Sequence, residues 1–450
     1  MRQIRTAQAS IFEIFSPHDI GRELSAMSDW LDEHPVVLDW VIDDLQHKGV
    51  EETGRRGLSA ESALRCGLLK QHRQLSYEEL AFHLTDSASF QAFARLPLHW
   101  CPKKSTLQHA ISAISAQTWE RINEVLLRDA KAKRVEPGQR IRIDSTVTDA
   151  PIHEPSDSSL LWDGVRVMVR LLEETKEWPG APRVNYVNHS RVAKKRARTI
   201  FYTRSPERRA ALYGDLIEAT RATLGYLDAA RLQLTAAGMY GIAFECWLAE
   251  ITWYKPLIEA VISQTERRVF GGESVPASEK VLSLFEPHTD IIVKGSRGVQ
   301  YGHKLNLSSG RSGLILDVVI EAGNPADSER FMPMLERHEE RYGCMPRQVA
   351  ADGSYASLDN LHQAKARGVE DVAFHKKRGL TVEDMVKSHW VYRRLRNFRA
   401  GIEAGVSCLK RAYGLARCTW KGLGHFKAYV WSSVVAYNMA LLNRPKPKPT

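Results

Sequence analysis

The chain has 450 residues, more than a single hydrophobic core usually serves, so two or three domains are expected. Its 43% hydrophobic content is ample for folding, and its formal net charge of +10 favours an anionic partner, with nucleic acid ahead of a membrane surface. No apolar run approaches the length of a membrane span, and charges interrupt residues 1–14, which excludes a signal-peptide core; we expect a cytoplasmic protein.

Residues 1–130 are expected to form a helical N-terminal domain. Three segments between residue 58 and about residue 130 have helical periodicity: SAESALRCGLLKQHRQ, LSYEELAFHLTDSASFQAF and STLQHAISAISAQTWERINEVLLRDA. The second and third start with capping-box spacing: Ser76 with Glu79, and Ser105 with Gln108. Lys103 and Lys104 precede the third segment, which makes it the candidate recognition helix of a helix-turn-helix DNA reader. A small three-helix bundle without a DNA-binding role explains the same pattern.

The pattern changes at residues 140–151, RIRIDSTVTDAP, where Ile141, Ile143 and Val147 predict a short strand. We assign residues 131–155 to this first core strand and the loop that follows it. Residues 156–285 return to helical periodicity, as in LLWDGVRVMVRLLEET, and are expected to form a large helical insertion.

A second block of strands follows the helical segment. HKLNLSS and GLILDVVIEAG flank the turn residues GRS and predict a hairpin. The segments SERFMPMLERHEERYG, RQVAADGSY, LDNLHQAKARG and EDVAFHKK then alternate between helix and strand, and a last helical region starts near Trp390. With the insertion removed, this is the element order of an α/β ribonuclease-H-like core, in which the insertion lies between the first and second core strands. Residues 286–445 complete this core, and residues 446–450 form a basic tail.

Two aspartates end predicted strands that are neighbours in such a core, Asp144 in RIRIDST and Asp352 in VAADGSY. Both would emerge at the same edge of the sheet, and Gly353 leaves room where the backbone turns or approaches a ligand. Phosphodiester cleavage and joining need an activated oxygen nucleophile, a stabilised leaving oxygen and neutralised phosphate charge. Two divalent cations about 3.5 to 4 Å apart supply all three. Because such cations prefer carboxylate oxygens, the two aspartates are candidate metal ligands.

A third carboxylate, Glu403, is predicted from helical spacing. In RNFRAGIEAGVSCLKRAYG, Glu403 follows Arg399 by four residues and precedes Lys410 by seven, so the three share one face of a helix. A metal-binding glutamate between two cations fits a site where the cations grip the phosphates beside the scissile bond. An ordinary Arg399 and Glu403 pair on a solvated helix fits the spacing as well.

The segments IRIDSTV, VAADGSY and R-x3-E-x6-K, in this order, resemble the DDE-type insertion-sequence transposases with the Y-x2-R-x3-E-x6-K signature. The stretch YGHKLNLSSGRSGLILDVVIEAGNPADSERF is similar to the second and third strands of that family. The segment RRGLSAESALRCGLLKQHRQLSYEELAFHL is similar to its N-terminal domain. The resemblance spans about residues 55–445.

This resemblance implies a metal-dependent DNA transposase, which is both a nuclease and a polynucleotidyl transferase. Such an enzyme hydrolyses the DNA at the ends of its element and joins the freed 3′ hydroxyls to target DNA. The resemblance further implies that Asp144, Asp352 and Glu403 are catalytic and hold two Mg²⁺ ions, for which Mn²⁺ substitutes. The expected partners are the terminal inverted repeats and target DNA, bound by a homodimer or higher assembly associated with the bacterial nucleoid.

The chain departs from the family pattern in two places. Arg396 stands where the signature has tyrosine, so that role is unfilled or falls to Tyr392 or Phe398. Many members carry an insertion just before the last catalytic helix, whereas the helical segment here lies earlier, so no role for it carries over by position. Neither departure affects the three carboxylates.

Two segments concentrate positive charge. Residues 191–209 hold eight Lys or Arg against Glu207 alone, with Phe201 and Tyr202 among them, and residues 391–430 hold nine against one glutamate. We expect these segments to attract DNA phosphates, although a solvated helix face explains the first equally well. The candidate DNA-binding residues are Arg399, Lys410, Arg396, Lys103, Lys104, Lys194, Lys195, Arg196 and Arg198.

Other polar side chains have simpler explanations. Asp327 or Ser328 is expected to cap the helix after the hairpin. Four carboxylates after the first strand are expected to be mostly solvated loop charges: Asp149, Glu154, Asp157 and Asp163. The cysteines show neither C-x-x-C pairs nor zinc spacing and are expected to be buried thiols in a reducing compartment: Cys66, Cys101, Cys246, Cys344, Cys408 and Cys418.

Two other functions remain open. A nuclease of the same fold would cleave DNA without joining it, and a catalytically decayed DNA-binding repressor would keep only the basic surfaces. The complete set of three carboxylates argues against the repressor. The chain also has no G-x-x-x-x-G-K-[ST] motif, which argues against an ATP-driven motor.

Overall fold

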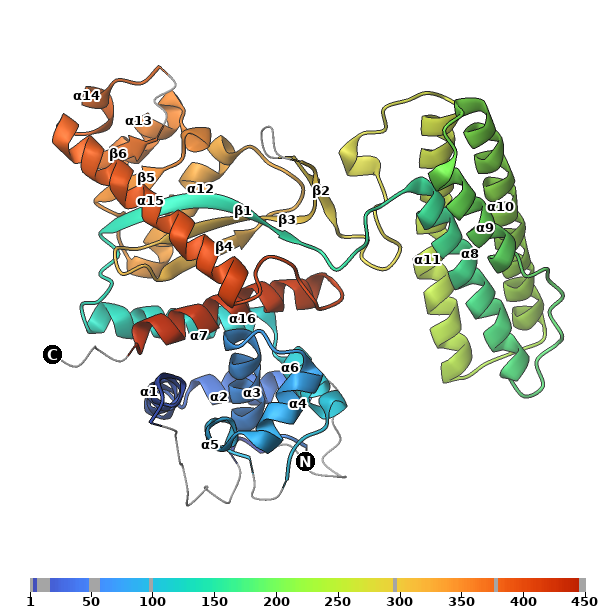
Figure 1. Ribbon diagram of the computed structural model, residues 1–450, viewed down its shortest axis with the longest axis horizontal. Helices are drawn as coiled ribbons and strands as arrows, with labels where there is room; N and C mark the ends of the chain where they lie inside the picture. Colours follow the sequence, from blue (N-terminus) through green and yellow to red (C-terminus); the bar gives the residue numbers. More distant parts are fainter. Residues whose placement is uncertain are drawn as a thin grey trace. The chain divides into compact units, whose positions relative to one another are not determined.

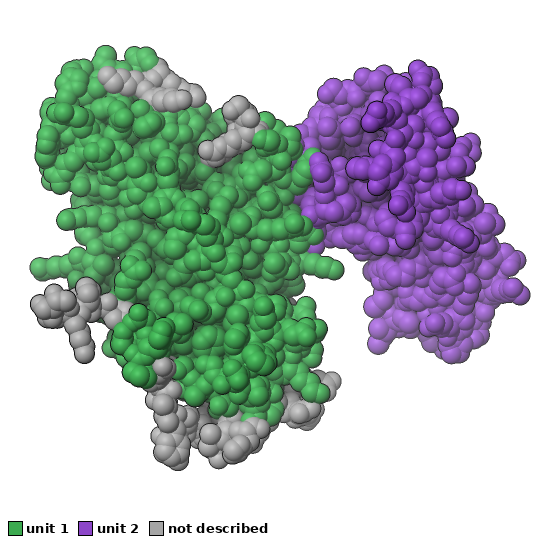
Figure 2. Space-filling view, viewed as in Figure 1, with its two compact units in different colours: residues 1–151, 292–450 green, residues 152–291 purple. Residues whose placement is uncertain are grey.

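The computed structural model describes residues 3–5, 17–47, 57–96, 100–293, 298–375 and 379–444. The chain divides into two compact units (Figure 2). The first unit combines Met1–Pro151 with Ile292–Thr450, and the second is Ile152–Ile291. The predicted basic tail lies outside the described residues.

The N-terminal part of the first unit is helical (Figure 1). Its helices are α1 (Asp19–Glu33), α2 (Val37–His47), α3 (Ala60–His72), α4 (Tyr77–Asp86), α5 (Ala88–Ala94), α6 (Lys104–Ala113) and α7 (Ala116–Ala132). Every residue of α3 is buried, so α3 is the central helix of this region. Its Arg65 forms ion pairs with Asp32 at 3.0 Å and with Glu61 at 3.3 Å, which compensate the cost of burying its charge.

Two of the three predicted helices in this region are each divided in two. The second segment breaks at Ser87, whose side chain accepts a hydrogen bond from the amide of Phe90 and caps α5. The third breaks at Ser115, which caps α7 by accepting from the amide of Thr118. A serine hydroxyl gives free helix amides an acceptor, so a periodic segment can end and restart at such a residue.

The two predicted capping boxes have opposite outcomes. The box of Ser76 with Glu79 is confirmed, with both of its reciprocal hydrogen bonds present. The box of Ser105 with Gln108 is wrong, because α6 already starts one residue before Ser105. The N-cap of α6 is Lys103, which makes no side-chain capping bond.

The last helix, α16 (Leu423–Leu442), joins these helices to a sheet. It packs against α3, α7 and β4 (Ile315–Ile320). The side chain of Asn438 forms hydrogen bonds with both backbone groups of Ile315, at 2.7 and 2.8 Å, and donates to Asn123 of α7 at 2.7 Å. The N-terminal helices and the sheet therefore share one hydrophobic core. Both α6 and α7 supply side chains to that core, and the exposed Lys103 and Lys104 at the start of α6 keep α6 as the candidate recognition helix.

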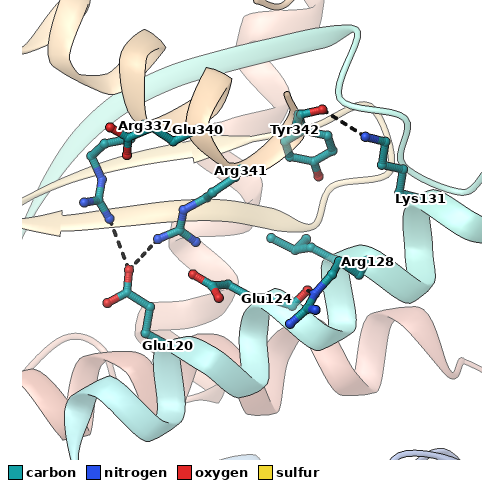
Figure 3. Close-up of a pocket in the computed structure, with 9 residues that line it drawn as sticks. Glu120, Glu124, Arg128, Lys131, Arg337, Glu340, Arg341 and Tyr342 are labelled. Atoms are coloured by element: carbon teal, nitrogen blue, oxygen red, sulfur yellow. Dashed lines mark hydrogen bonds and ion pairs between the residues drawn. The ribbon is translucent and has the colours of Figure 1, made fainter. Parts of the chain in front are cut away.

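A charged cavity of about 340 Å³ lies between α7 and α12 (Asp327–Tyr342) (Figure 3). Glu120 of α7 pairs with Arg337 at 3.2 Å and also with Arg341. Both arginines pair in turn with Asp317 of β4, at 2.5 and 2.8 Å, and that residue is 1% exposed. This network is a second link between the N-terminal helices and the sheet.

The sheet is mixed, and five of its strands follow the order β4-β3-β1-β5-β6. Besides β4, these strands are β1 (Arg140–Asp149), β3 (Gln300–Ser309), β5 (Gln348–Ala351) and β6 (Asp371–Phe374). The predicted hairpin is confirmed, because β3 and β4 are antiparallel neighbours. β1 is antiparallel to β3 and parallel to β5, and β5 is parallel to β6. The sixth strand is β2 (Asp290–Ile292), at the boundary of the two units.

Three further helices follow α12 around the sheet: α13 (Leu358–Ala366), α14 (Val382–Met385) and α15 (His389–Ala412). α12 packs on β3 and β4, whereas α15 packs on β1, β5 and β6. Apolar side chains of α12, α15, β5 and β6 form one core with those of β1. The long helix α15 is thereby held across the strands that carry the predicted aspartates.

The start of α12 differs from the prediction. Its N-cap is Ala326, which makes no side-chain capping bond, so the prediction that Asp327 or Ser328 caps this helix is wrong. Asp327 instead pairs with Lys304 of β3 at 2.6 Å, and both side chains are 7% exposed. A buried ammonium group is costly unless it is paired. The Asp327 carboxylate therefore pairs with Lys304 instead of capping the helix.

Gly302 of β3 pairs with Asp149 of β1 where the two backbones are close. A Cβ at Gly302 would lie 2.0 Å from the carbonyl oxygen of Thr148 and 2.8 Å from the Cα of Asp149. We expect Gly302→Ala to lower the free energy of unfolding by about 3 kcal/mol, because backbone within a paired strand cannot move aside. Chemical denaturation measures this, with Gly298→Ala as control, since a Cβ there would meet nothing within 4 Å. Equal stability of the two variants would contradict the prediction.

The second unit is built from four helices: α8 (Asp157–Glu174), α9 (Ser190–Tyr202), α10 (Pro206–Ala236) and α11 (Ile242–Val269). The helices pack against one another as a bundle (Figure 1). Their apolar side chains form a separate hydrophobic core. Asp157 and Asp163 are not solvated loop charges as expected, because both are buried in α8. They pair with Arg268 at 2.7 Å and Arg166 at 2.8 Å, respectively, and burial raises the pKa of Asp163.

The expectation of six buried thiols is only partly met. Cys66 and Cys418 are buried, whereas Cys246 and Cys344 are exposed, and all six cysteines are free. Burial raises the pKa of the Cys66 thiol. Isolated cysteines carry no spacing signal, so the sequence could not separate the exposed ones from those in the core.

Candidate active site

The ends of β1 and β5 bring the two predicted aspartates to one level of the sheet. The strands are parallel, and Ile143 of β1 pairs with Ala351 of β5. Asp144 directly follows Ile143, and Asp352 directly follows Ala351. Asp352 is also the N-cap of the short 3-10 turn Gly353–Tyr355, where the chain leaves the strand. Both carboxyl groups therefore come from neighbouring positions on adjacent strands.

One guanidinium group, that of Arg399 in α15, joins all three predicted carboxylates. Its Nη2 lies 3.3 Å from Oδ2 of Asp144 and 3.6 Å from Oδ1 of Asp352. Its Nη1 lies 2.9 Å from Oε1 of Glu403. Because Oδ2 of Asp144 and Oδ1 of Asp352 contact the same nitrogen atom, the two carboxyl groups lie close to each other. Three separate elements, β1, the end of β5 and α15, contribute one carboxylate each to this cluster.

The cluster opens to solvent on the side of Glu403. The side chain of Arg399 is 11% exposed and that of Asp144 is 14% exposed, whereas Asp352 is 35% and Glu403 60% exposed. The Nε of Arg399 is buried without a hydrogen-bond partner among the described residues. The guanidinium group is thus enclosed by carboxylates, although the helical spacing predicted a cation that grips phosphates. Spacing determines which side chains share a helix face but not what that face contacts.

Arg142, which the sequence analysis did not single out, fixes α15 to the sheet. Its Nε donates to Oγ of Ser309 at 2.7 Å, and its Nη1 donates to the carbonyl oxygen of Phe398 at 2.8 Å. Its guanidinium carbon lies 4.7 Å from the centre of the Phe398 ring. Because Phe398 directly precedes Arg399, these contacts set the helical turn that carries Arg399. The available signal was a charged residue between the apolar residues of RIRID.

Gly401 provides the space through which Arg142 reaches α15. A Cβ at Gly401 would lie 2.0 Å from Nη1 of Arg142. We expect Gly401→Ala to displace this guanidinium from the Phe398 carbonyl and to lower DNA cleavage roughly tenfold, since shifted catalytic groups lose rate steeply. A cleavage assay measures the effect.

Gly405→Ala is the matched control on the same helix. A Cβ there would meet only the hydroxyl of Tyr437, at an ordinary 3.5 Å. Alanine is the better helix former, so this control should keep activity and gain up to about 1 kcal/mol of stability. Gly401→Ala with the activity of Gly405→Ala would show that the Arg142 contact does not position the site.

A buried polar chain supports the strands behind the cluster. The hydroxyl of Tyr355 donates to Oδ1 of Asn306 at 2.5 Å, and Nδ2 of Asn306 donates to Oε1 of Glu321 at 2.8 Å. Burial and nearby carboxylates, including Asp144, raise the pKa of Tyr355, so its hydroxyl stays protonated and donates. The sequence signal for Tyr355 was its position three residues after Asp352.

The residues considered for the signature tyrosine have other contacts. Arg396 is exposed on α15. The hydroxyl of Tyr392 donates to the carbonyl oxygen of Phe374 at 2.9 Å, which binds α15 to β6. Phe398 is the aromatic face for Arg142. In these contacts Tyr392 and Phe398 hold α15 in place.

The remaining predicted DNA-binding residues lie in three places. Lys103 and Lys104 are exposed at the start of α6, where Lys104 pairs with Glu78 at 3.3 Å. Lys410 is half-buried on α15. The others lie on α9 of the second unit. Lys194, Lys195 and Arg198 are exposed, whereas Arg196 pairs with Asp215 at 3.0 Å.

The carboxylate cluster fits a divalent cation in its chemistry. Among the described residues, no three His, Cys, Asp or Glu side chains are already arranged so that they could hold a metal ion. The three carboxylates nevertheless share a single guanidinium charge, which leaves excess negative charge on hard oxygen ligands. Such ligands suit Mg²⁺ or Mn²⁺.

Two family models match the chain, one on each side of the second unit. The model described as Transposase DDE domain matches residues 294–439, and the model described as Transposase domain (DUF772) matches residues 18–113. The chain belongs to the DDE transposases of insertion sequences. The resemblance inferred from sequence is thereby confirmed at the level of the family. No curated protein and no solved structure matches the chain.

Membership of this family makes the protein a DNA transposase that binds DNA and belongs to the metal-dependent nucleases and transferases. The helical N-terminal region and the mixed sheet agree with a transposase of this type. The match to the DDE domain, residues 294–439, contains Asp352 and Glu403, whereas Asp144 lies outside both matches. Over the described residues, no helix of this transposase combines the length and apolarity needed to span a membrane.

Proposed function

We propose that this transposase cleaves the DNA at the ends of its insertion sequence and transfers the freed 3′ hydroxyls to target DNA. The observation that carries the proposal is the convergence of Asp144, Asp352 and Glu403 on one guanidinium group, at 3.3, 3.6 and 2.9 Å. In this proposal the three carboxylates hold two Mg²⁺ ions, or Mn²⁺ in their place. Bound there, these ions would activate the attacking oxygen and stabilise the leaving oxygen.

The transposase's own residues would present these ligands and the DNA. Arg142 holds α15 against the sheet, and Arg399 keeps the carboxylates close while it neutralises part of their charge. Arg396 and Lys410 on α15 are proposed to bind phosphates beside the site. We further propose that the lysines at the start of α6 and the basic residues of α9 contact DNA phosphates. The transposase would act as a homodimer or higher assembly on the terminal inverted repeats.

We propose a ribonuclease-H-like core for the sheet of the first unit. The support is the strand order β4-β3-β1-β5-β6, with an antiparallel part followed by parallel strands, and the position of α15 across β1, β5 and β6. The second unit, which follows β1 in the chain, would then be the insertion.

An assay of cleavage and joining tests the function. A labelled duplex is made from the DNA that flanks the coding sequence, and a second duplex carrying a free 3′ hydroxyl is offered with plasmid target. We expect cleavage and joined products in Mg²⁺ and neither after chelation. Cleavage without joining would identify a nuclease, and binding without cleavage in Mg²⁺ or Mn²⁺ would identify a decayed repressor.

A further inference from the structure

The turn between α9 and α10 forms an open groove of about 540 Å³ in the second unit. Arg198, Arg204, Arg208 and Tyr202 line it, together with three residues that bear hydroxyl groups. The groove thus combines three guanidinium groups with an aromatic ring, and its three hydroxyl groups donate their protons to neighbouring protein oxygens. Its volume lies in the range of sites that hold a small organic molecule.

The three arginines of this groove are available to an anion. Among the described residues, none forms an ion pair with the guanidinium groups of Arg198, Arg204 or Arg208, whereas Arg196 of the same helix pairs with Asp215. The carboxylate nearest in sequence, Glu207, accepts a hydrogen bond from the hydroxyl of Ser205 at 2.8 Å. Planar guanidinium groups match the oxygens of a phosphate, so the groove has the charge and donors for a phosphate group.

Hydrogen bonds fix the turn that shapes the groove. Arg209 donates to the carbonyl oxygen of Thr203 from Nε at 3.1 Å and from Nη2 at 2.6 Å. The hydroxyl of Ser205 accepts from the amide of Arg208 at 3.3 Å and caps α10, whose first residue is Pro206. The backbone between the two helices is therefore ordered before any ligand arrives, which reduces the entropic cost of binding.

Two aromatic side chains stand in solvent at the end of α9. Phe201 is 76% and Tyr202 is 70% exposed, and their ring centres lie 5.2 Å apart at an angle of 86°. Bases in a paired duplex already stack on each other and offer no ring face. An unpaired base does, and stacking on aromatic side chains beside a basic groove is a general way to bind single-stranded nucleic acid.

We propose that this groove binds an unpaired nucleotide of DNA. Arg198, Arg204 and Arg208 hold the phosphate, and Phe201 or Tyr202 stacks on the base. The inference rests on the proposed action on DNA, and it assigns to the second unit the binding of DNA where a strand is not paired.

Fluorescence anisotropy with two labelled DNA probes tests the proposal. One probe is a fully paired duplex, and the other is the same duplex with a bulge of three unpaired nucleotides. The full chain carries Asp144→Asn and is measured with EDTA, so that cleavage does not interfere. We expect about tenfold tighter binding of the bulged probe, and loss of this preference in Phe201→Ala with Tyr202→Ala, while the paired probe binds as before. Arg198→Ala with Arg204→Ala and Arg208→Ala should weaken the bulged complex more than the paired one.

Matched controls lie away from the groove: Arg231 is on α10 about 35 Å along the helix from Arg208, and Tyr240 follows the end of α10. Tyr240→Ala removes an aromatic ring that is 90% exposed, and Arg231→Ala removes an exposed guanidinium group; neither should change the preference. Equal weakening of both probes by the Phe201 and Tyr202 changes, or no weakening of either, would overturn the proposal. So would groove variants that lose binding to anionic phospholipid vesicles but keep the DNA preference. Because no cleavage is measured, a chain inactive in joining DNA would refute the proposed function and leave this result intact.

Discussion

Exchange of any one of Asp144, Asp352 and Glu403 for the corresponding amide should lower DNA cleavage roughly 10³-fold, because each exchange removes an anionic metal ligand. The folded state should not suffer. The three carboxylates share one guanidinium charge, so removal of one negative charge lowers the repulsion within the cluster. Cleavage assays in Mg²⁺ together with thermal unfolding measure the two effects separately.

Glu383→Gln is the matched control for these exchanges. Glu383 lies on α14 near the start of α15, and its side chain is 71% exposed. It should cleave DNA at the rate of the unchanged enzyme. Near-normal cleavage by Glu403→Gln would remove that residue from the site, and a large loss of stability in the Asp144→Asn variant would leave its lost activity without a catalytic explanation.

The second large effect is expected at Arg399. Arg399→Gln should lower the free energy of unfolding without metal by about 3 kcal/mol, because the carboxylates lose their common cation while Asp144 stays only 14% exposed. The same variant should gain more thermal stability from added Mg²⁺ than the unchanged protein, since a bound cation no longer competes with a guanidinium group for these oxygens. Thermal unfolding over a Mg²⁺ titration measures both effects without an activity assay.

Two variants make this experiment specific to Arg399. Arg396→Gln removes an exposed positive charge from the same helix and should change neither the stability nor its response to Mg²⁺. Arg399→Lys should restore only part of the stability, because an ammonium group cannot donate in the planar fork that spans Asp144, Asp352 and Glu403. An unchanged response to Mg²⁺ in Arg399→Gln would show that the guanidinium group does not compete with a metal for these carboxylates.

Local patterns accounted for many of the elements. Alternating apolar residues predicted β1, turn residues predicted the β3 and β4 hairpin, and the Ser76 box predicted the start of α4. The same kind of pattern failed at Ser105, at Asp327 and at the breaks before α5 and α7. At these places several residues can serve as a cap, and packing against distant elements selects one of them.

The candidate site shows the same division. The sequence alone predicted that Asp144 and Asp352 end strands. It also predicted that Arg399 and Glu403 share a helix face. Both follow because side-chain direction in strands and helices is set by the order of neighbouring residues. Only the tertiary structure directed Arg399 into the carboxylates, since Asp144 lies 255 residues away in the chain. Ion pairing and burial depend on which residues, distant in the chain, meet in a region that excludes water. The periodicity of neighbouring residues carries no information about such contacts.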